Sequence, residues 1–459
     1  MITDCFSGRH SSGSRPAVAA FEEAVVGVAA HRPSVASALD RTLAADPAFV
    51  AAHALKGFAT VILAREELEA PALDALGQAE AALARHGRGT LTERILVRAL
   101  KEAVAGRLSA AAAVLDAHLV ERPRDLLALK LSHALHFMRG ESIAMLTATS
   151  RALDGWTSSL PGYGFVLGCH AFGLEESGDR VGAEAVGQAA LGLEPRDAWG
   201  LHAVAHVYEM SGRSADGMNW LDRSRPAWSQ CNNFAFHVAW HLALFLHAQG
   251  CTDRALEIYD TEVRPAPTDD FRDVANAVSF LWRFGQEGID VGDRWTELQR
   301  IAHRRRHDTT LVFASLHYLM ALVATGTMSS ARELAAAIEQ HGRAGTGDQA
   351  GVAATVGHAL AIEILALGER RSGRGDLSRL VALLPRVGGS HAQRDVFVRT
   401  LALIATDRGD RAAADRVLAL RRQLKRDDRF VSLVERRLRA AENECHGWHR
   451  TAPRIESIA

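Results

Sequence analysis

The chain is poor in several residue types, and each scarcity argues against a class of protein. Only four of its 53 basic residues are lysines, and its formal net charge is -1. A balanced charge predicts no strongly basic surface, so no nucleic-acid partner is expected. No uninterrupted apolar run reaches the roughly 18 residues of a membrane-spanning helix, so no membrane span is predicted.

Cysteine is also scarce. The five cysteines are odd in number, and none of them forms a Cys-x-x-Cys pair. They therefore indicate neither a disulfide framework nor a thiolate zinc site. The segment Met1–Arg15 is polar and lacks the apolar core of a secretory signal. We therefore expect free thiols and a cytoplasmic location.

Strand signals are rare, whereas helical signals occur throughout the chain. Apolar residues recur at three- and four-residue spacing, as in Ala331, Leu334, Ala335 and Ile338, which is typical of amphipathic helices. The twelve prolines fall mostly between such runs. Short turns containing glycine separate segments of about 12–15 residues. This pattern predicts pairs of antiparallel helices.

A period of about 34 residues joins these helix pairs into repeats, which is the length of a tetratricopeptide repeat. When the turn glycine is placed at repeat position 15, units begin at Gly164, Ala198, Phe236, Val312 and Asp395. Their turn glycines are Gly178, Gly212, Gly250, Gly326 and Gly409. We predict an all-α, right-handed superhelix of helical hairpins over residues 16–443, with no sheet. Residues 1–15 and 444–459 are expected to be flexible tails.

Several motifs also resemble one family. They are Asp197-Ala-Trp199, His202-Ala-Val-Ala-His206-Val-Tyr-Glu209-Met210, His237-Val-Ala-Trp240-His241, Ala255-Leu-Glu-Ile-Tyr259-Asp260, Leu127-Ala-Leu-Lys130-Leu-Ser-His133 and Gln393-Arg-Asp-Val-Phe397. They are similar to motifs of the tetratricopeptide repeat protein 38 family, and the resemblance runs from about Asp46 to Arg437. Ser315 and His391 depart from the Asp and Asn expected there. The resemblance implies an architecture and no established reaction.

Histidine is abundant, with 21 residues, and its spacing is informative. His202 and His206 are four residues apart, as are His237 and His241, so each pair lies on one helix face. The pairs occupy repeat positions 5 and 9 and then 2 and 6, which face the concave groove of a tetratricopeptide domain. A third pair, His303 with His307, flanks three arginines and predicts a solvated basic face.

These two pairs predict a metal site. Phe234–Leu246 is almost entirely apolar apart from its two histidines, which predicts a buried helix. Buried imidazoles need hydrogen-bond partners or a metal ion. Zinc is the preferred divalent metal for nitrogen and carboxylate ligands, and iron, nickel and manganese are alternatives. Four histidines would close the site, whereas three and a water would leave it open for catalysis. A hydrogen-bonded histidine cluster without metal is the other interpretation.

Further residues in the same repeat register are candidates for the functional site. Glu209 follows His206 by three residues and could be a ligand, a positioning partner or the general base of catalysis. His317, Arg272 and Asn276 fall at inward repeat positions and are candidate substrate-binding residues, with Arg272 suited to an anionic group.

Two classes of function remain open. The first is a metal-dependent enzyme that acts on a small-molecule ligand in the groove, with hydrolysis favoured and oxygen chemistry expected if the metal is iron. The second is a tetratricopeptide scaffold that binds a partner protein or peptide, with a structural histidine cluster. Self-association is compatible with both, and fold alone does not decide between them.

Overall fold

The computed structural model describes residues 1–87, 89–371, 373, 375–426 and 428–451, with side chains as far as residue 440. The first part of the chain forms β1 (Ile2–Thr3), β2 (Arg9–His10), α1 (Arg15–Ala29), α2 (Val35–Ala45), α3 (Val50–Ile62), η1 (Glu66–Leu68), α4 (Glu69–Arg85), α5 (Leu91–Val104), α6 (Leu108–Glu121), α7 (Leu126–Arg139), α8 (Ser142–Leu153), α9 (Tyr163–Glu176) and α10 (Arg180–Leu193).

The middle of the chain forms α11 (Ala198–Met210), α12 (Ser214–Arg223), α13 (Arg225–Trp228), α14 (Phe234–Ala248), α15 (Thr252–Ile258), η2 (Tyr259–Val263), α16 (Phe271–Gln286), η3 (Gly292–Arg294), α17 (Trp295–Arg304) and α18 (Val312–Ala324). The last part forms α19 (Met328–Ala344), α20 (Gly347–Val352), η4 (Ala353–Gly357), α21 (His358–Gly368), α22 (Leu377–Leu383), η5 (Leu384–Val387), α23 (His391–Asp407), α24 (Arg411–Leu424) and α25 (Arg429–Thr451).

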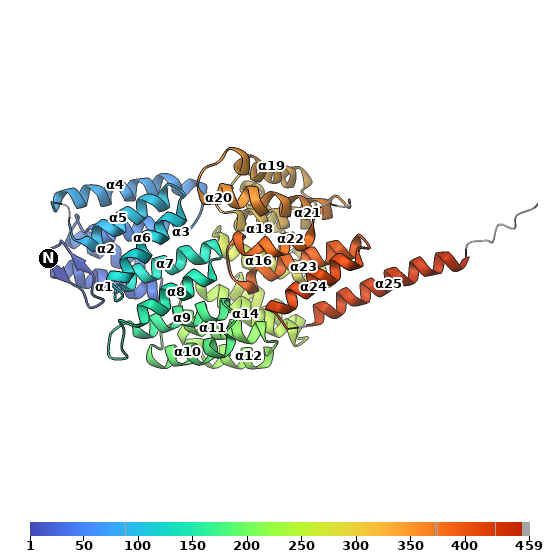
Figure 1. Cartoon of the computed structure of the whole chain (residues 1–459), viewed down its shortest axis with the longest axis horizontal. Coiled ribbons are helices and arrows are strands. Elements are labelled where there is room, and N and C mark those ends of the chain that lie inside the picture. Colours follow the sequence, from blue (N-terminus) through green and yellow to red (C-terminus); the bar gives the residue numbers. More distant parts are fainter. Residues whose placement is uncertain (88, 372, 374, 427, 452–459) are drawn as a thin grey trace, which may run out of the picture.

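Consecutive helices pack as antiparallel hairpins, and each hairpin packs on the next. Gly178 and Gly212 turn between the helices of two hairpins with φ of 96° and 71°, a backbone region that favours glycine. The predicted all-α solenoid of tetratricopeptide-like hairpins is therefore confirmed. In Figure 1 the chain runs from the N-terminal helices at one end to α25, which extends away from the body.

Aspartate begins many of these helices. Asp125, Asp179, Asp197 and Asp410 precede α7, α10, α11 and α24, and each side chain accepts a hydrogen bond from a backbone N–H of the first turn. This cap satisfies a donor that the helix itself leaves unpaired. The local sequence thus fixes where α11, which carries two of the histidines, begins.

The N-terminal segment differs from its prediction as a flexible tail. Residues of β1 and β2 pair as a short antiparallel ribbon, and Phe6 and His10 are buried. The hydroxyl and backbone N–H of Ser11 both donate to Glu93 of α5 at 2.9 Å. The prediction of a loosely packed segment without a sheet is therefore wrong, because a partner 82 residues away in sequence supplies these contacts.

At the other end, α25 continues through the predicted tail boundary at residue 443 to Thr451, and residues 452–459 lie outside the described part of the chain. The C-terminal limit of the solenoid and the tail of residues 444–459 stay a prediction.

The solenoid closes on itself. The backbone N–H of Asp348 in α20 donates to the carbonyl of Gly106 beside α6, and Arg305 pairs with Glu67 of η1 at 2.6 Å. The helix α23 packs against both α11 and α16. Every residue of α11 is consequently buried, and the concave side is filled by side chains around that helix. The helix α11 thus has no free face, whereas His31, Phe234 and His237 beside it are partly exposed.

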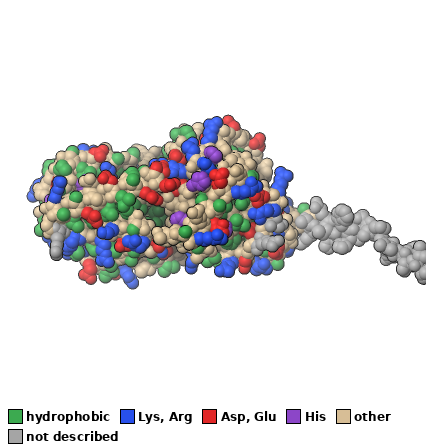
Figure 2. All heavy atoms as spheres, turned by 90° about the horizontal axis from the view of Figure 1, so that it is seen from above, with side chains coloured by type: hydrophobic (Ala, Val, Ile, Leu, Met, Phe, Trp, Pro, Cys, Tyr) green, Lys and Arg blue, Asp and Glu red, His purple; other side chains and the backbone are tan. Residues whose placement is uncertain are grey.

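One stretch is long and apolar enough to cross a membrane by composition. It is the continuous helical segment Gly347–Gly368, with a mean hydropathy of 1.7 and 56% of its window buried within the structure. Its last part, α21, packs on α18 and α19 as the other inner helices pack on their neighbours. On the face shown in Figure 2, basic and acidic side chains are interspersed.

Candidate metal centre

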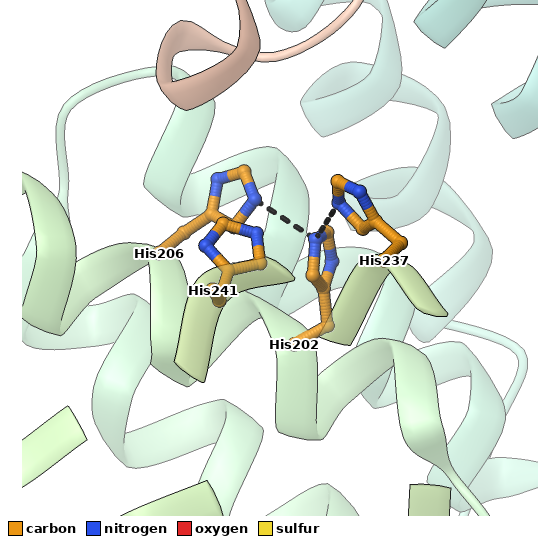
Figure 3. Close-up of side chains that lie close together, drawn as sticks. All are labelled: His202, His206, His237 and His241. Carbon is orange, nitrogen blue, oxygen red and sulfur yellow. Dashed lines mark hydrogen bonds between the residues drawn. The ribbon is translucent and has the colours of Figure 1, made fainter. Parts of the chain in front are cut away.

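The four predicted histidines come together from two neighbouring inner helices. His202 and His206 lie one turn apart on α11, and His237 and His241 lie one turn apart on α14. Figure 3 shows their imidazole rings turned toward one another from these helices. The i, i+4 spacing and the packing of α11 on α14 together produce this convergence.

The ring nitrogens are within metal-bridging distance. The Nε2 atom of His202 lies 2.9 Å from Nε2 of His206 and 2.9 Å from Nε2 of His237. One ligand atom from each of the four histidines can be chosen so that all lie within 4.8 Å of one another. Zinc–nitrogen bonds of about 2.0–2.1 Å separate tetrahedral ligands by about 3.4 Å, so only small side-chain movements would seat an ion.

The cluster lies in an apolar interior. His206 and His241 are fully buried, His202 is 1% exposed, and His237 alone is partly exposed. Burial and the neighbouring imidazoles lower the pKa of His202, and burial lowers the pKa of His241 to about 4. These two rings are therefore neutral at pH 7, which is the state in which imidazole binds metals.

In three of the rings, the outer nitrogen, which is the Nδ1 atom that points away from the centre of the cluster, faces an oxygen atom of a neighbouring side chain. Nδ1 of His241 donates to Oε2 of Glu209 at 2.7 Å, and Nδ1 of His237 donates to Oδ1 of Asn276 at 2.9 Å. Nδ1 of His206 lies 3.4 Å from a carboxylate oxygen of Glu175. An N–H at Nδ1 leaves the lone pair of a neutral ring at Nε2, which points inward.

Three ring nitrogens of the cluster form no hydrogen bond among the described residues. They are Nε2 of His241, on the inner side, and Nδ1 of His202 and of His206, on the outer side; of the two outer atoms, Nδ1 of His206 still lies 3.4 Å from Glu175. An unpaired buried acceptor is costly, and a metal ion at the centre would satisfy the inner one. His202 differs from the other three rings because no oxygen holds its outer nitrogen.

Glu209 is bound from two sides. Its second oxygen accepts a hydrogen bond from Nζ of Lys425 at 3.1 Å, and its side chain is 5% exposed. Burial alone would raise the pKa of Glu209, but Lys425 and His241 lower it well below its usual value. This geometry is that of a carboxylate that positions a metal ligand. A role of Glu209 as general base stays a prediction.

The three predicted substrate-binding residues have different surroundings. Asn276 joins the cluster through His237. Arg272 forms a forked pair with Asp270 of its own helix cap at 2.5 and 2.9 Å. Nδ1 of His317 donates to the carbonyl of Phe313, and burial lowers the pKa of His317 to about 4. The structure thus brings only Asn276 into contact with the four histidines, and substrate binding stays a prediction for all three.

Sequence reasoning missed two residues of the site, Glu175 and Lys425. Glu175 holds position 12 of the unit that begins at Gly164, which is the position that Glu209 holds in the next unit. The repeat register therefore contained the signal for Glu175. Lys425 lies 216 residues from Glu209 in sequence, and no local pattern indicates their contact.

A second group of possible ligands shares His206 with the cluster. Glu175 and Glu176 of α9 both lie close to His206. Glu176 is already engaged, because it accepts a hydrogen bond from the first N–H of α23 at 2.7 Å and pairs with Arg394 at 3.2 Å. Burial raises the pKa of Glu175, whereas the two carboxylates outweigh burial and raise the pKa of His206. We therefore regard this group as a support of His206.

No family model matches the chain. Among solved structures, the crystal structure of the yeast Tom70 is 15% identical, with a TM-score of 0.36 over 95% of this chain and 89% of that chain. The structure of Naa15/Naa10 bound to HypK-THB is 17% identical, with a TM-score of 0.22 over 85% of this chain and 67% of that chain. At these scores neither likeness carries an argument, and the fold rests on the contacts of this chain.

Proposed function

We propose that this chain is a helical-repeat protein that holds one divalent metal ion, preferably zinc, between His202, His206, His237 and His241. One observation carries the proposal. Three of the four rings have their outer nitrogens turned to oxygen atoms of Glu209, Asn276 and Glu175, which is how proteins orient metal-binding histidines. An all-nitrogen ligand set suits zinc, and iron is the closest alternative, since manganese prefers oxygen ligands.

The geometry favours a structural ion. Four nitrogen ligands in a buried site fill a tetrahedral shell and leave no coordination position for a substrate. Such an ion would hold α11 and α14 together. Through Glu209 and Lys425, it would also link the end of α24 to these two helices. The free energy of metal binding would then contribute to the free energy of unfolding.

Catalysis requires an open fourth position. His202 is the ring that would have to leave it, since its outer nitrogen has no partner among the described residues. A water molecule could then reach the ion past the partly exposed His237, with Glu209 as general base for hydrolysis. The contacts of Glu209 with Lys425 and His241 support this metal-dependent enzyme less well than a structural ion.

A scaffold for a partner protein is the second candidate function, and the tetratricopeptide-like architecture favours it. Because the inner side is filled around α11, a partner would bind on the outside. An open hollow of about 570 Å³ lies along α1, with Glu22 and Glu23 on its wall beside Arg32 and Arg196. A protein segment with both charge signs would suit this wall.

Two further assignments belong to the proposal. Membership of the tetratricopeptide repeat protein 38 family rests on the sequence motifs, and a cytoplasmic location rests on the cysteine pattern. Neither assignment enters the argument for the metal.

Metal content together with thermal unfolding tests the proposal. The purified wild-type chain should contain about one metal ion, and His206→Ala and His241→Ala should each lose most of it because each removes one ligand of four. Chelation should lower the melting temperature of the wild type by about 5 °C or more and leave the two variants unchanged.

The control is His307→Ala, since that side chain is 61% exposed and lies at the surface. It should keep both the metal and the chelator effect. Full metal occupancy in both ligand variants would refute the site. Hydrolytic turnover by the metal-loaded wild type that His202→Ala retains would favour the catalytic role over the structural one.

A further inference from the structure

A second buried polar cluster lies beside the histidines, and the proposed metal does not use it. It contains Lys130 and His133 of α7, Asp197 at the start of α11, and Trp199 in the first turn of α11. All four are at least nine-tenths buried. The sequence motifs that contain them are far apart along the chain, and the packing of these helices joins them.

Lys130 is a buried cation without an acidic partner. Its side chain is 7% exposed, and its Nζ atom lies 5.6 Å from the ring centroid of Trp199. Among the described residues, no carboxylate oxygen is within ion-pair distance of it. By contrast, Lys425 pairs with Glu209 at 3.1 Å and with Asp395 at 3.8 Å. The thiol of Cys169 is a hydrogen-bond partner of Lys130, but a thiol does not neutralise its charge. A buried ammonium group without an anionic partner is strongly unfavourable, so Lys130 has unused capacity for an anion.

His133 supplies a second free donor on the same helix face, because it lies three residues after Lys130. Its Nε2 atom accepts a hydrogen bond from the indole N–H of Trp199 at 3.0 Å, which places the proton of the neutral ring on Nδ1. That Nδ1 is buried without a partner among the described residues. Lys130 lacks an anionic partner and Nδ1 of His133 lacks any acceptor, so a carboxylate oxygen would suit both neighbouring donors.

The acid of the cluster, Asp197, is engaged through one oxygen only, and its Oδ1 atom is buried without a hydrogen-bond partner among the described residues. One oxygen of Asp197 accepts the N–H of Gly200 at 3.2 Å and so caps α11. Burial raises the pKa of Asp197 to about 7, against the opposing effect of Lys130. The raised pKa shows that burial disfavours the charged form of this carboxyl group, so Asp197 is a weak counter-ion for Lys130.

Aromatic rings lead from this cluster to the surface. His31 stacks on Phe234 with ring centroids 4.3 Å apart and on Trp199 with centroids 5.5 Å apart. His31 and Phe234 are partly exposed. After burial, the charges of Lys130 and Arg272 are the largest causes that lower the pKa of His31, so the electrostatic potential at this ring is positive. These rings form an apolar surface next to the two donors, against which the apolar part of a ligand can pack.

We propose that a small organic carboxylate binds beside Lys130, with its oxygens accepting hydrogen bonds from the ammonium group and from Nδ1–H of His133. Its apolar part lies against the rings of Trp199, His31 and Phe234. The two donors belong to α7 and none of the groups that would contact the carboxylate is a proposed metal ligand, so the proposal holds for the metal-free chain as well.

Titration calorimetry with benzoate tests the proposal, and benzamide is the matched uncharged probe. Wild-type chain treated with chelator should bind benzoate and not benzamide. Lys130→Met should weaken benzoate binding at least tenfold, because a charge-assisted hydrogen bond is lost. The control is Lys101→Met, since Lys101 is exposed and pairs with Glu80 at 3.5 Å. It should bind as the wild type does.

Thermal unfolding distinguishes this site from a water-bridged pair of Lys130 with Asp197. If Lys130 has no partner in the free chain, Lys130→Met should not lower the melting temperature, since methionine fills a similar volume without a buried charge. A lower melting temperature in Lys130→Met, equal affinity for benzoate and benzamide, or undiminished benzoate binding in Lys130→Met would each overturn the proposal.

Discussion

At the scale of single residues, the site depends on how each outer nitrogen is held. Glu209 links His241 to Lys425, and its low pKa keeps it charged at neutral pH. A carboxylate on the outer nitrogen makes an imidazole a stronger metal ligand and fixes its orientation. The proposed roles of Glu209, as positioning residue or as base, therefore predict different consequences of its replacement.

We predict that Glu209→Gln lowers metal affinity by about ten- to a hundredfold, because the amide is a weaker partner for Nδ1 of His241. Competition with a chromogenic chelator measures this change. The control is Glu184→Gln, which removes a surface carboxylate that pairs with Arg213 at 2.6 Å. Unchanged metal affinity combined with a fall in turnover would contradict the positioning role and support the base.

At the scale of helices, glycine sets how closely α10 approaches α11. A Cβ atom added at Gly187 would lie 2.6 Å from a methyl group of Val204 and 2.9 Å from the carbonyl oxygen of Gly200. The second contact is with backbone, which yields little. Gly187 thereby allows α11, with His202 and His206, to sit against the preceding hairpin.

We therefore predict that Gly187→Ala destabilises the chain by about 1–3 kcal/mol, since the two helices must move apart. Gly192→Ala is a close control on the same helix, because nothing lies within 4 Å of its added Cβ. It should be stabilising by about 0.5–1 kcal/mol. Denaturant unfolding of both variants measures the difference, and an equal change in the two would be inconsistent with the close approach.

At the scale of the whole molecule, closure of the solenoid buries many histidines at once. His317 is one that lies away from the proposed metal, with Phe313 as its hydrogen-bond partner and the charge of Arg283 nearby. Its pKa of about 4 in the folded chain is below its ordinary value of 6.5. The unfolded chain therefore binds more protons between these two values.

It follows that the free energy of unfolding of the metal-free chain should fall as the pH falls from about 6.5 to about 4. Above that range, the neutral His317 should contribute its full share of the stability. His317 alone contributes about 3 kcal/mol at most across this window. The free energy of unfolding of His317→Leu should depend less steeply on pH than that of the wild type. Parallel pH profiles for the two chains would refute this assignment.

Much of the architecture follows from the sequence, because repeats are local. The turn glycines, the aspartate caps and the 3.6-residue periodicity act within one hairpin, so the hairpins and the helix faces of the four histidines could be predicted. The pairing of His202 with His237 also followed, since successive units contact each other directly. The N-terminal ribbon could not be predicted, because Ser11 finds its partner Glu93 on a distant helix.

The sequence alone determined a helical-hairpin repeat with two histidine pairs on inner faces. Only the tertiary structure decided how these pairs are supported. Lys425 reaches Glu209 across 216 residues, and the packing of α7 on α9, with the hydrogen bond from Trp199 to His133, brings Lys130 to Trp199. The physical reason is that the closed solenoid brings distant helices together in an interior without water. There every buried nitrogen and charge needs a partner, and no local pattern records which residue provides it.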